Sequence, residues 1–324
     1  MGTFLFSALT LAVLLQAPVP SGVGRGGPPD SVAALRDRAA RDSTDAELWL
    51  LMGRAYLELG AEAHGPGHRA PEDSAWANAI LDTAEGALTR AAALAGPLGA
   101  SAIGDSARVL RVGTWAARSW SAWEVAGIQA GQDAIGPLPT DLRLPAVLEE
   151  LGENLLRACP AGGVLLTAGG ADAYAAWFMR FARDLRPDLL VLPLAMWRED
   201  ALLRARLTRD LKLARRGDTD PWLRELVRRR TVCVSMGFER PPDTRPRIAW
   251  QARTLQWVAG TGTSSPRVPP RDFVFAALRL ALDDNDPWAA PALAAYTRAA
   301  RATPGLCEAM ATFKVASDVP TCRR

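Results

Sequence analysis

The chain has 324 residues, a net charge of +3 at neutral pH and an apolar fraction of 49%. This length can hold two domains, and the apolar fraction allows a sizeable core. The small net charge gives no strong attraction to nucleic acid, so we expect no nucleic-acid partner.

Residues 1–20 have the composition of a membrane anchor or a signal segment. From Thr3 to Val19 the chain is almost entirely apolar, and as a helix it would span roughly 25 Å, just short of a bilayer core. No basic residue precedes this run and no A-x-A cleavage site follows it, so we expect it to remain as a membrane helix. The first basic residue, Arg25, follows the run, which taken alone favours a cytoplasmic location for the rest of the chain. Residues 21–29, rich in Gly and Pro, form the expected linker.

Helical periodicity predicts an all-α domain over residues 30–136. In the helix expected at 46–59, Trp49, Met52, Gly53 and Tyr56 have the spacing of the first helix of a tetratricopeptide repeat. Gly53 stands where that repeat needs a small residue for close helix packing. Residues 84–91 are similar to the second helix of the repeat. The segment thus resembles one or two repeats, which would need the second domain or a partner to complete their core.

A further helix, predicted from Arg108 to Val125, carries Trp115, Trp120 and Trp123. Five and eight residues turn a helix by different angles, so these three side chains cannot all point the same way. Burial is the ordinary role of a tryptophan. We nevertheless expect at least one of the three to leave the core of this domain, which makes them candidates for a protein interface.

After the domain boundary predicted at residues 136–139, an α/β domain is expected over residues 140–262. An apolar run ends in Gly169 and Gly170, a helical segment follows, and a second apolar run begins near Leu189. This pattern predicts a βαβ unit with parallel strands and a right-handed crossover. Ligands of α/β domains usually bind at such a corner, so the candidate ligand-binding residues are Thr167, Gly169, Gly170 and Asp172. The ordinary role of Asp172 is to cap the helix N-terminus.

The same stretch resembles the soluble C-terminal module of a bacterial membrane-protein family related to the protein O-mannosyltransferases. That family carries T-N-G-D-N-D-T-F-P-L-W-Y after a strand, then a helix and R-P-D. The positions that match in register are Thr167, Gly169, Asp172, Trp177, Arg186, Pro187 and Asp188. Ala168, Gly170 and Ala171 replace Asn and Asp residues of the family. The resemblance covers about residues 145–260 and implies an exported, periplasmic domain, which we adopt over the charge of Arg25.

Helices are expected next at 199–216 and 220–230, then a strand at 231–238 and a returning edge strand at 248–258. Residues 263–324 form a C-terminal helical extension, with helices at 272–282 and 288–302. The two helices before the strand carry an arginine cluster that includes Arg204, Arg215, Arg216, Arg228 and Arg229. Such runs are usually solvated faces; the functional alternative is contact with anionic lipid or with an acidic partner.

Four cysteines and two histidines limit the chemistry. Cys307 and Cys322 flank a 14-residue segment, and a disulfide between them would stabilise the tail by roughly 3 kcal/mol in an oxidising compartment. Cys233 lies in an apolar strand and is expected to be a buried thiol. His64 and His68 lie in a Gly- and Pro-rich loop. No pair has metal-ligand spacing, so we expect neither a metal nor a cofactor.

The fold class predicted from the sequence is therefore mixed: an N-terminal membrane helix, a tetratricopeptide-like domain, a small α/β domain and C-terminal helices. Two functions remain open. The first is a non-catalytic, membrane-anchored scaffold or stabilising subunit, whose partners are the other subunits of a membrane complex; a photosynthetic reaction centre–antenna assembly is one candidate. The second is a sugar- or lipid-carrier-binding accessory, or a degenerate enzyme, of an envelope glycosyltransferase system. The replaced Asn and Asp residues favour the first and argue against catalysis.

Overall fold

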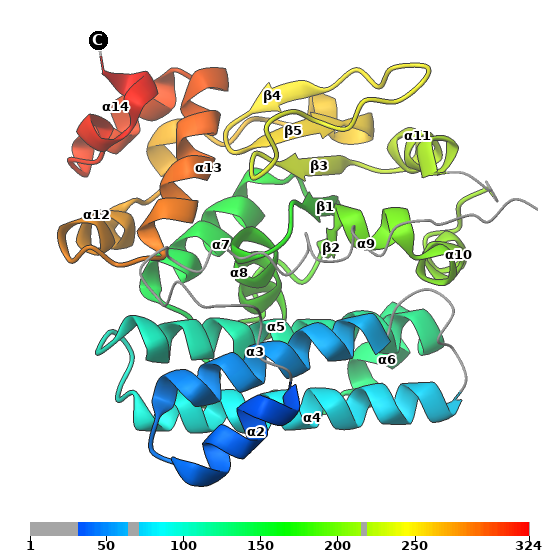
Figure 1. The fold of residues 1–324 in the computed structure, drawn as a ribbon. Helices are drawn as coiled ribbons and strands as arrows, with labels where there is room; N and C mark the ends of the chain where they lie inside the picture. Colours follow the sequence, from blue (N-terminus) through cyan, green and yellow to red (C-terminus); the bar gives the residue numbers. More distant parts are fainter. Residues whose placement is uncertain (1–31, 64–70, 215–218, 324) are drawn as a thin grey trace, which may run out of the picture.

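The computed structural model describes residues 32–63, 71–214 and 219–323. A layer of helices lies beneath a five-stranded sheet with its own helices (Figure 1). The helices of the lower layer are α2 (Val32–Arg41), α3 (Ala46–Ala63), α4 (Pro71–Leu94), α5 (Ala102–Ala126) and α6 (Ile128–Ala134). The mostly helical composition with a small mixed sheet agrees with the predicted fold class at this level.

Glycines allow α3 and α4 to pack closely. A Cβ atom on Gly53 would lie 2.6 Å from Leu88 of α4, and one on Gly60 would lie 2.7 Å from Leu81. These glycines are seven residues apart and therefore lie on one side of α3. The close packing expected at Gly53 is confirmed.

The sheet has the strand order β2-β1-β3-β5-β4. Its strands are β1 (Val164–Thr167), β2 (Leu190–Pro193), β3 (Val232–Ser235), β4 (Gln251–Arg253) and β5 (Gln256–Ala259). β1 pairs in parallel with β2 and with β3, whereas β5 pairs antiparallel with β3 and β4. Parallel pairing across the helix that follows β1 was predicted and is confirmed.

Two groups of helices surround the sheet. Those in the α/β part are α7 (Ala146–Ala158), α8 (Ala171–Phe181), α9 (Leu194–Glu199), α10 (Ala201–Asp210) and α11 (Thr219–Arg229). The C-terminal helices are α12 (Ala276–Asp283), α13 (Ala289–Ala302) and α14 (Gly305–Thr312). Short 3-10 turns occur at Gly260–Ser264, Pro270–Asp272, Ala316–Asp318 and Pro320–Cys322. The C-terminal helices lie beside the sheet, with α13 next to the β4–β5 hairpin (Figure 1).

The expected edge strand at 248–258 is wrong. The chain instead turns after Arg253 through Thr254 and Leu255, and forms the hairpin of β4 and β5. Leu255 lies in this turn with a φ of 66°, a left-handed conformation. The sequence has no Gly or Asn at this position to indicate such a turn. As a result β5 lies inside the sheet and β4 forms the edge. The helix expected at 199–216 also ends early, because α10 stops at Asp210.

The hydrophobic core crosses the boundary predicted at residues 136–139. Val112 and Trp123 of α5 belong to the same buried cluster as Leu165 of β1 and Phe178 of α8. A Cβ atom on Gly113 would lie 2.7 Å from the Tyr174 ring, so α5 and α8 are in close contact at that point. One face of α5 therefore shares a core with the sheet, whereas α2, α3 and α4 pack in separate clusters of the helical layer.

No helix in the described ranges is both long and apolar enough to cross a membrane. The expected anchor at 1–20 and the linker at 21–29 lie outside the described residues, as do His64 and His68.

Glu150 of α7 caps α12. Its carboxylate accepts the backbone N–H groups of Ala277 and Leu278 at 2.8 and 3.0 Å. Burial raises the pKa of Glu150 to about 7, although these hydrogen bonds favour the charged form.

This raised pKa predicts a pH-dependent stability. The folded protein binds the Glu150 proton more tightly than the unfolded chain, so this contribution is fully present below about pH 4.5 and is lost as the pH rises to about 7. It corresponds to roughly 3 kcal/mol. Urea unfolding at several pH values should show the decline, and Glu150→Gln should flatten it. An unchanged slope in this variant would contradict the assignment to Glu150.

Candidate functional site

The carboxyl ends of β1 and β3 mark the topological switch point of the sheet. From β1 the chain crosses through α8 to β2 on one side, while β3 lies on the other side. In open α/β sheets the connections diverge at such a point and leave a crevice, which is the usual ligand site. The loop of residues 168–170 follows β1 here, and residues 236–239 follow β3. The corner predicted from the sequence is thus at the expected place in the fold.

Asp172, in the first turn of α8, ties these two loops together. Its carboxylate accepts the N–H groups of Ala168 at 2.9 Å and Gly169 at 3.0 Å. The hydroxyl of Ser235, the last residue of β3, also hydrogen-bonds to it. The same hydroxyl oxygen accepts the N–H of Gly237 at 2.9 Å. Asp172 therefore fixes the β1–α8 loop and the end of β3, in addition to lying at a helix N-terminus.

The space around this carboxylate is filled by the protein itself. Asp172 is 6% exposed, and a Cβ atom on Gly237 would lie only 2.5 Å from its Oδ2 atom. Burial raises the pKa of Asp172 even though the hydrogen bonds from Ala168 and Ser235 lower it. A carboxylate held in this way has no free oxygen facing a ligand and acts as a structural bridge.

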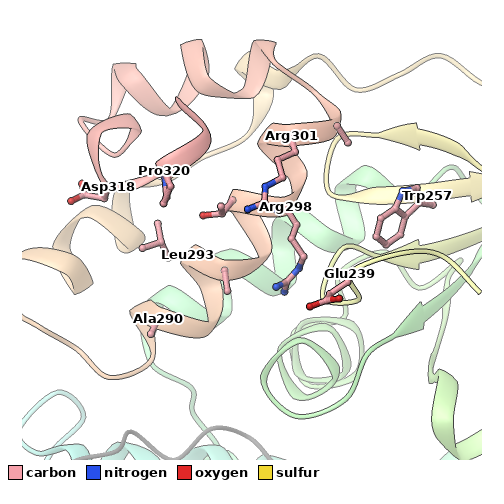
Figure 2. Close-up of a pocket in the computed structure, with 11 residues that line it drawn as sticks. Glu239, Trp257, Ala290, Leu293, Arg298, Arg301, Asp318 and Pro320 are labelled. Atoms are coloured by element: carbon pink, nitrogen blue, oxygen red, sulfur yellow. The ribbon is translucent and has the colours of Figure 1, made fainter. Parts of the chain in front are cut away.

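Arg298 of α13 covers the corner from the C-terminal part of the chain. Its Nε atom donates to the carbonyl oxygen of Met236 at 2.6 Å. Burial lowers the pKa of Arg298, and the charges of Asp172 and Glu239 raise it. Its guanidinium points toward Glu239 in the loop after β3 (Figure 2). The crevice where an α/β fold would usually bind a ligand is thus closed by a helix of the same chain.

A groove of about 840 Å³ opens beside this closed corner. It runs along one face of α13, and β5 contributes Trp257 to its wall (Figure 2). The polar and aromatic groups that line it are Glu239, Trp257, Thr297, Arg298, Arg301 and Asp318. None of these was selected from the sequence, since they come from a loop, a strand, a helix and the tail, which lie far apart along the chain.

The four candidate ligand residues are together at the corner, but the two that carry side chains, Thr167 and Asp172, are buried. Thr167 is fully buried, and its Oγ1 has no hydrogen-bond partner among the described residues. Gly169 and Gly170 have φ values of 118° and 57°, which the tight turn into α8 requires. Sequence reasoning missed Ser235, Gly237 and Arg298, the groups that complete and close the corner. The position of Ser235 at a strand end was the only available signal for them.

Asp172→Asn should lower the free energy of unfolding by about 1–2 kcal/mol. Loss of the charge removes part of the cost of burial. However, an NH2 group replaces one carboxylate oxygen and faces N–H donors, so the hydrogen bonds that this oxygen accepted are lost. Denaturant titration at neutral pH measures the effect, and Asp184→Asn, at an 85% exposed side chain just past α8, is the matched control. Equal stability of the two variants would contradict the bridging role of Asp172.

Two of the three tryptophans that were candidates for a protein interface are buried in the core of the protein. Trp123 is fully buried and Trp120 is 7% exposed, both in the core shared by α5 and the sheet. Both therefore lie outside the core of the helical domain, as was expected of at least one of the three, but they pack against the α/β part of the same chain and are not available to a partner. Trp115 is half-buried, and the Arg118 guanidinium lies 4.7 Å from its ring centroid.

The arginine cluster is largely committed to internal contacts. Arg228 and Arg229 both pair with the buried Glu225, at 2.6 and 3.3 Å. Arg204 donates to the carbonyl oxygen of Arg198. Glu225 offsets one positive charge of the cluster, which reduces the charge that it offers to lipid or to an acidic partner. Arg215 and Arg216 lie outside the described residues.

All four cysteines are paired. Cys307 and Cys322 form the predicted disulfide. Cys159 and Cys233 form a second one, so the expectation of a buried free thiol at Cys233 is wrong. The C-terminal end of α7 lies beside β3, which brings these two sulfurs together. Within the described ranges, no group of three or more His, Cys, Asp or Glu residues is arranged to hold a metal ion.

No protein-family model, curated protein or solved structure gives a match to this chain.

Proposed function

We propose that this protein is a membrane-anchored, non-catalytic scaffold or stabilising subunit of a larger membrane complex. The observation that carries the proposal is the closed switch-point corner. Asp172 is bonded to the loop after β1 and to Ser235 at the end of β3, and Arg298 of α13 is bonded to Met236 in the loop after β3. General acid–base chemistry needs a titratable group within reach of a substrate, and Asp172 lacks that access.

The two disulfides support an exported location for the folded part. Disulfides persist in oxidising compartments such as the periplasm and are rare where thiols are kept reduced. Here they pair all four cysteines of the chain. A periplasmic domain attached through the apolar residues 3–19 would be in a position to contact other membrane subunits.

The helical layer offers a surface for such contacts. Trp76 of α4 is 54% exposed and Leu51 of α3 is 38% exposed, whereas the other faces of these helices pack inward. Exposed tryptophan is enriched at protein interfaces. We infer that a tetratricopeptide-like platform of α2–α5 carries the docking surface.

Native purification tests the proposal. Membranes of the source cell, washed with sodium carbonate and solubilised in mild detergent, should retain the chain, which should migrate with other subunits on size-exclusion chromatography. Trp76→Ala should reduce recovery of these partners, while Asp184→Asn should not. Release of the chain by carbonate, or its migration alone, would contradict the proposal.

The second candidate is a sugar- or lipid-carrier-binding accessory of an envelope glycosyltransferase system. The groove along α13 favours it, because Trp257 and the arginines offer an aromatic face and hydrogen-bond donors beside the sheet's switch point. Saturable binding of a polyprenyl-phosphate sugar, lost on replacement of Trp257, would rank this function first.

A further inference from the structure

We propose that the groove along α13 binds a small organic monoanion. Its carboxylate or phosphodiester group would lie against Arg298 and Arg301, and its ring or apolar body would lie on Trp257. This goes beyond the scaffold function, and either proposal can fail without the other.

The position and size of the groove point to a ligand site. It lies beside the switch-point corner, because Glu239 in the loop after β3 lines it, as does Arg298, which bonds to Met236 in the same loop. Ligands of α/β domains usually bind near such a corner. Its volume of about 840 Å³ is within the range of roughly 300–1,000 Å³ typical of small-molecule sites.

The charges in the groove favour an anionic group. Arg298 is half-buried and held by its bond to Met236, so its guanidinium is partly preorganised. Arg301 is three residues further along the same face of α13, and it forms no ion pair or hydrogen bond with a residue that the structure describes. Asp318 is already paired with Arg279 at 2.9 Å. Two neighbouring guanidiniums, one of them unpaired, are suited to a carboxylate or phosphate.

Glu239 and Trp257 narrow the choice of ligand. The exposed Glu239 carboxylate faces Arg298 across the groove and would repel a second negative charge (Figure 2). Trp257 is half-buried in β5 and lies on the same side of the groove as Glu239 (Figure 2). Small side chains of α13, including Ala290 and Ala294, leave the opposite wall open and apolar. These features favour a ligand that carries one negative charge next to a flat or apolar group.

Calorimetric titration of the full chain at neutral pH with diphenyl phosphate and benzoate, which are both monoanions, and with inorganic phosphate tests the proposal. We expect saturable binding of the two ring compounds and weaker binding of inorganic phosphate, and the ratio of the first two distinguishes a phosphate from a carboxylate ligand. Arg301→Gln should weaken binding about tenfold or more, since hydrogen bonds to charged groups contribute at least that factor. Glu239→Gln should tighten it, because a like charge is removed.

Arg301 is exposed, so its replacement should leave the fold intact. Arg36→Gln, at an exposed position on α2 in the helical layer, is the matched control and should bind as the unaltered chain does. No saturable binding of either ring compound at millimolar concentration would overturn the proposal. Equal affinities of the unaltered chain and Arg301→Gln would also overturn it.

Discussion

Trp123→Ala is expected to lower the free energy of unfolding by about 4 kcal/mol. Trp123 is fully buried at the seam between α5 and α8, and its ring centroid lies 5.5 Å from that of Phe181. Its removal would leave a cavity between α5 and α8. The two helices cannot move closer to fill this cavity, because they are already in contact at Gly113 and Tyr174. The core shared by α5 and the sheet would then lose one of the two tryptophans that α5 contributes to it.

Denaturant unfolding followed by far-UV circular dichroism measures this change. Trp76→Ala is the matched control, since the Trp76 side chain is 54% exposed on α4 and its loss should change stability by no more than about 0.5 kcal/mol. A single cooperative transition in both variants would support one shared core. A loss below about 1 kcal/mol for Trp123→Ala would show that α5 does not depend on this contact and would return Trp123 to the interface candidates.

Local patterns were sufficient to predict the βαβ unit and the tight helix pair. Apolar runs that end in glycines correctly placed β1, α8 and β2, because β-propensity and turn chemistry are properties of neighbouring residues. Gly53 was predicted to lie at a close helix contact because its side of α3 was evident from helical spacing. The same reasoning placed the candidate corner at Thr167–Asp172 correctly in the sheet.

Contacts between distant segments could not be predicted in this way. Arg298 reaches Met236 across 62 residues of sequence, and nothing on its own helix distinguishes it from Arg301. The turn at Leu255 uses a left-handed residue that is neither Gly nor Asn, so the hairpin resembled a single strand. Helical spacing predicted that Trp115, Trp120 and Trp123 do not all point the same way, but it could not show that the α/β part supplies the surface that buries Trp120 and Trp123.

Cysteine pairing shows the same limit. Four cysteines allow three connectivities, and sequence spacing favours only the short Cys307–Cys322 loop. Cys159 and Cys233 are joined because α7 ends beside β3, a consequence of the whole α/β fold. The Cys159–Cys233 disulfide, which closes the longer of the two loops, was therefore not predicted, although it constrains the unfolded chain more.

Removing the Cys159–Cys233 disulfide is expected to cost about 4 kcal/mol, the second of the two largest effects. The bond joins residues 74 apart, and closing so long a loop restricts the unfolded chain more than the 15-residue separation of Cys307 and Cys322, for which about 3 kcal/mol is expected. Denaturant unfolding of the Cys159→Ala/Cys233→Ala double variant and of the Cys307→Ala/Cys322→Ala double variant compares them directly.

Stepwise reduction measures a second difference between the two disulfides, their accessibility in the native state. Cys159 and Cys233 are buried, with exposed fractions of 1% and 0%, whereas Cys307 and Cys322 are half-buried near the C-terminus. Dithiothreitol under native conditions should therefore free two thiols first, and maleimide labelling with mass spectrometry should locate them at Cys307 and Cys322. The other two should appear only when the protein unfolds, because a reductant must reach the sulfur to attack it. Early labelling of Cys159 or Cys233 would mean that α7 separates from β3 in the native state. The folded domain would then be much less dependent on an oxidising compartment than its two disulfides imply.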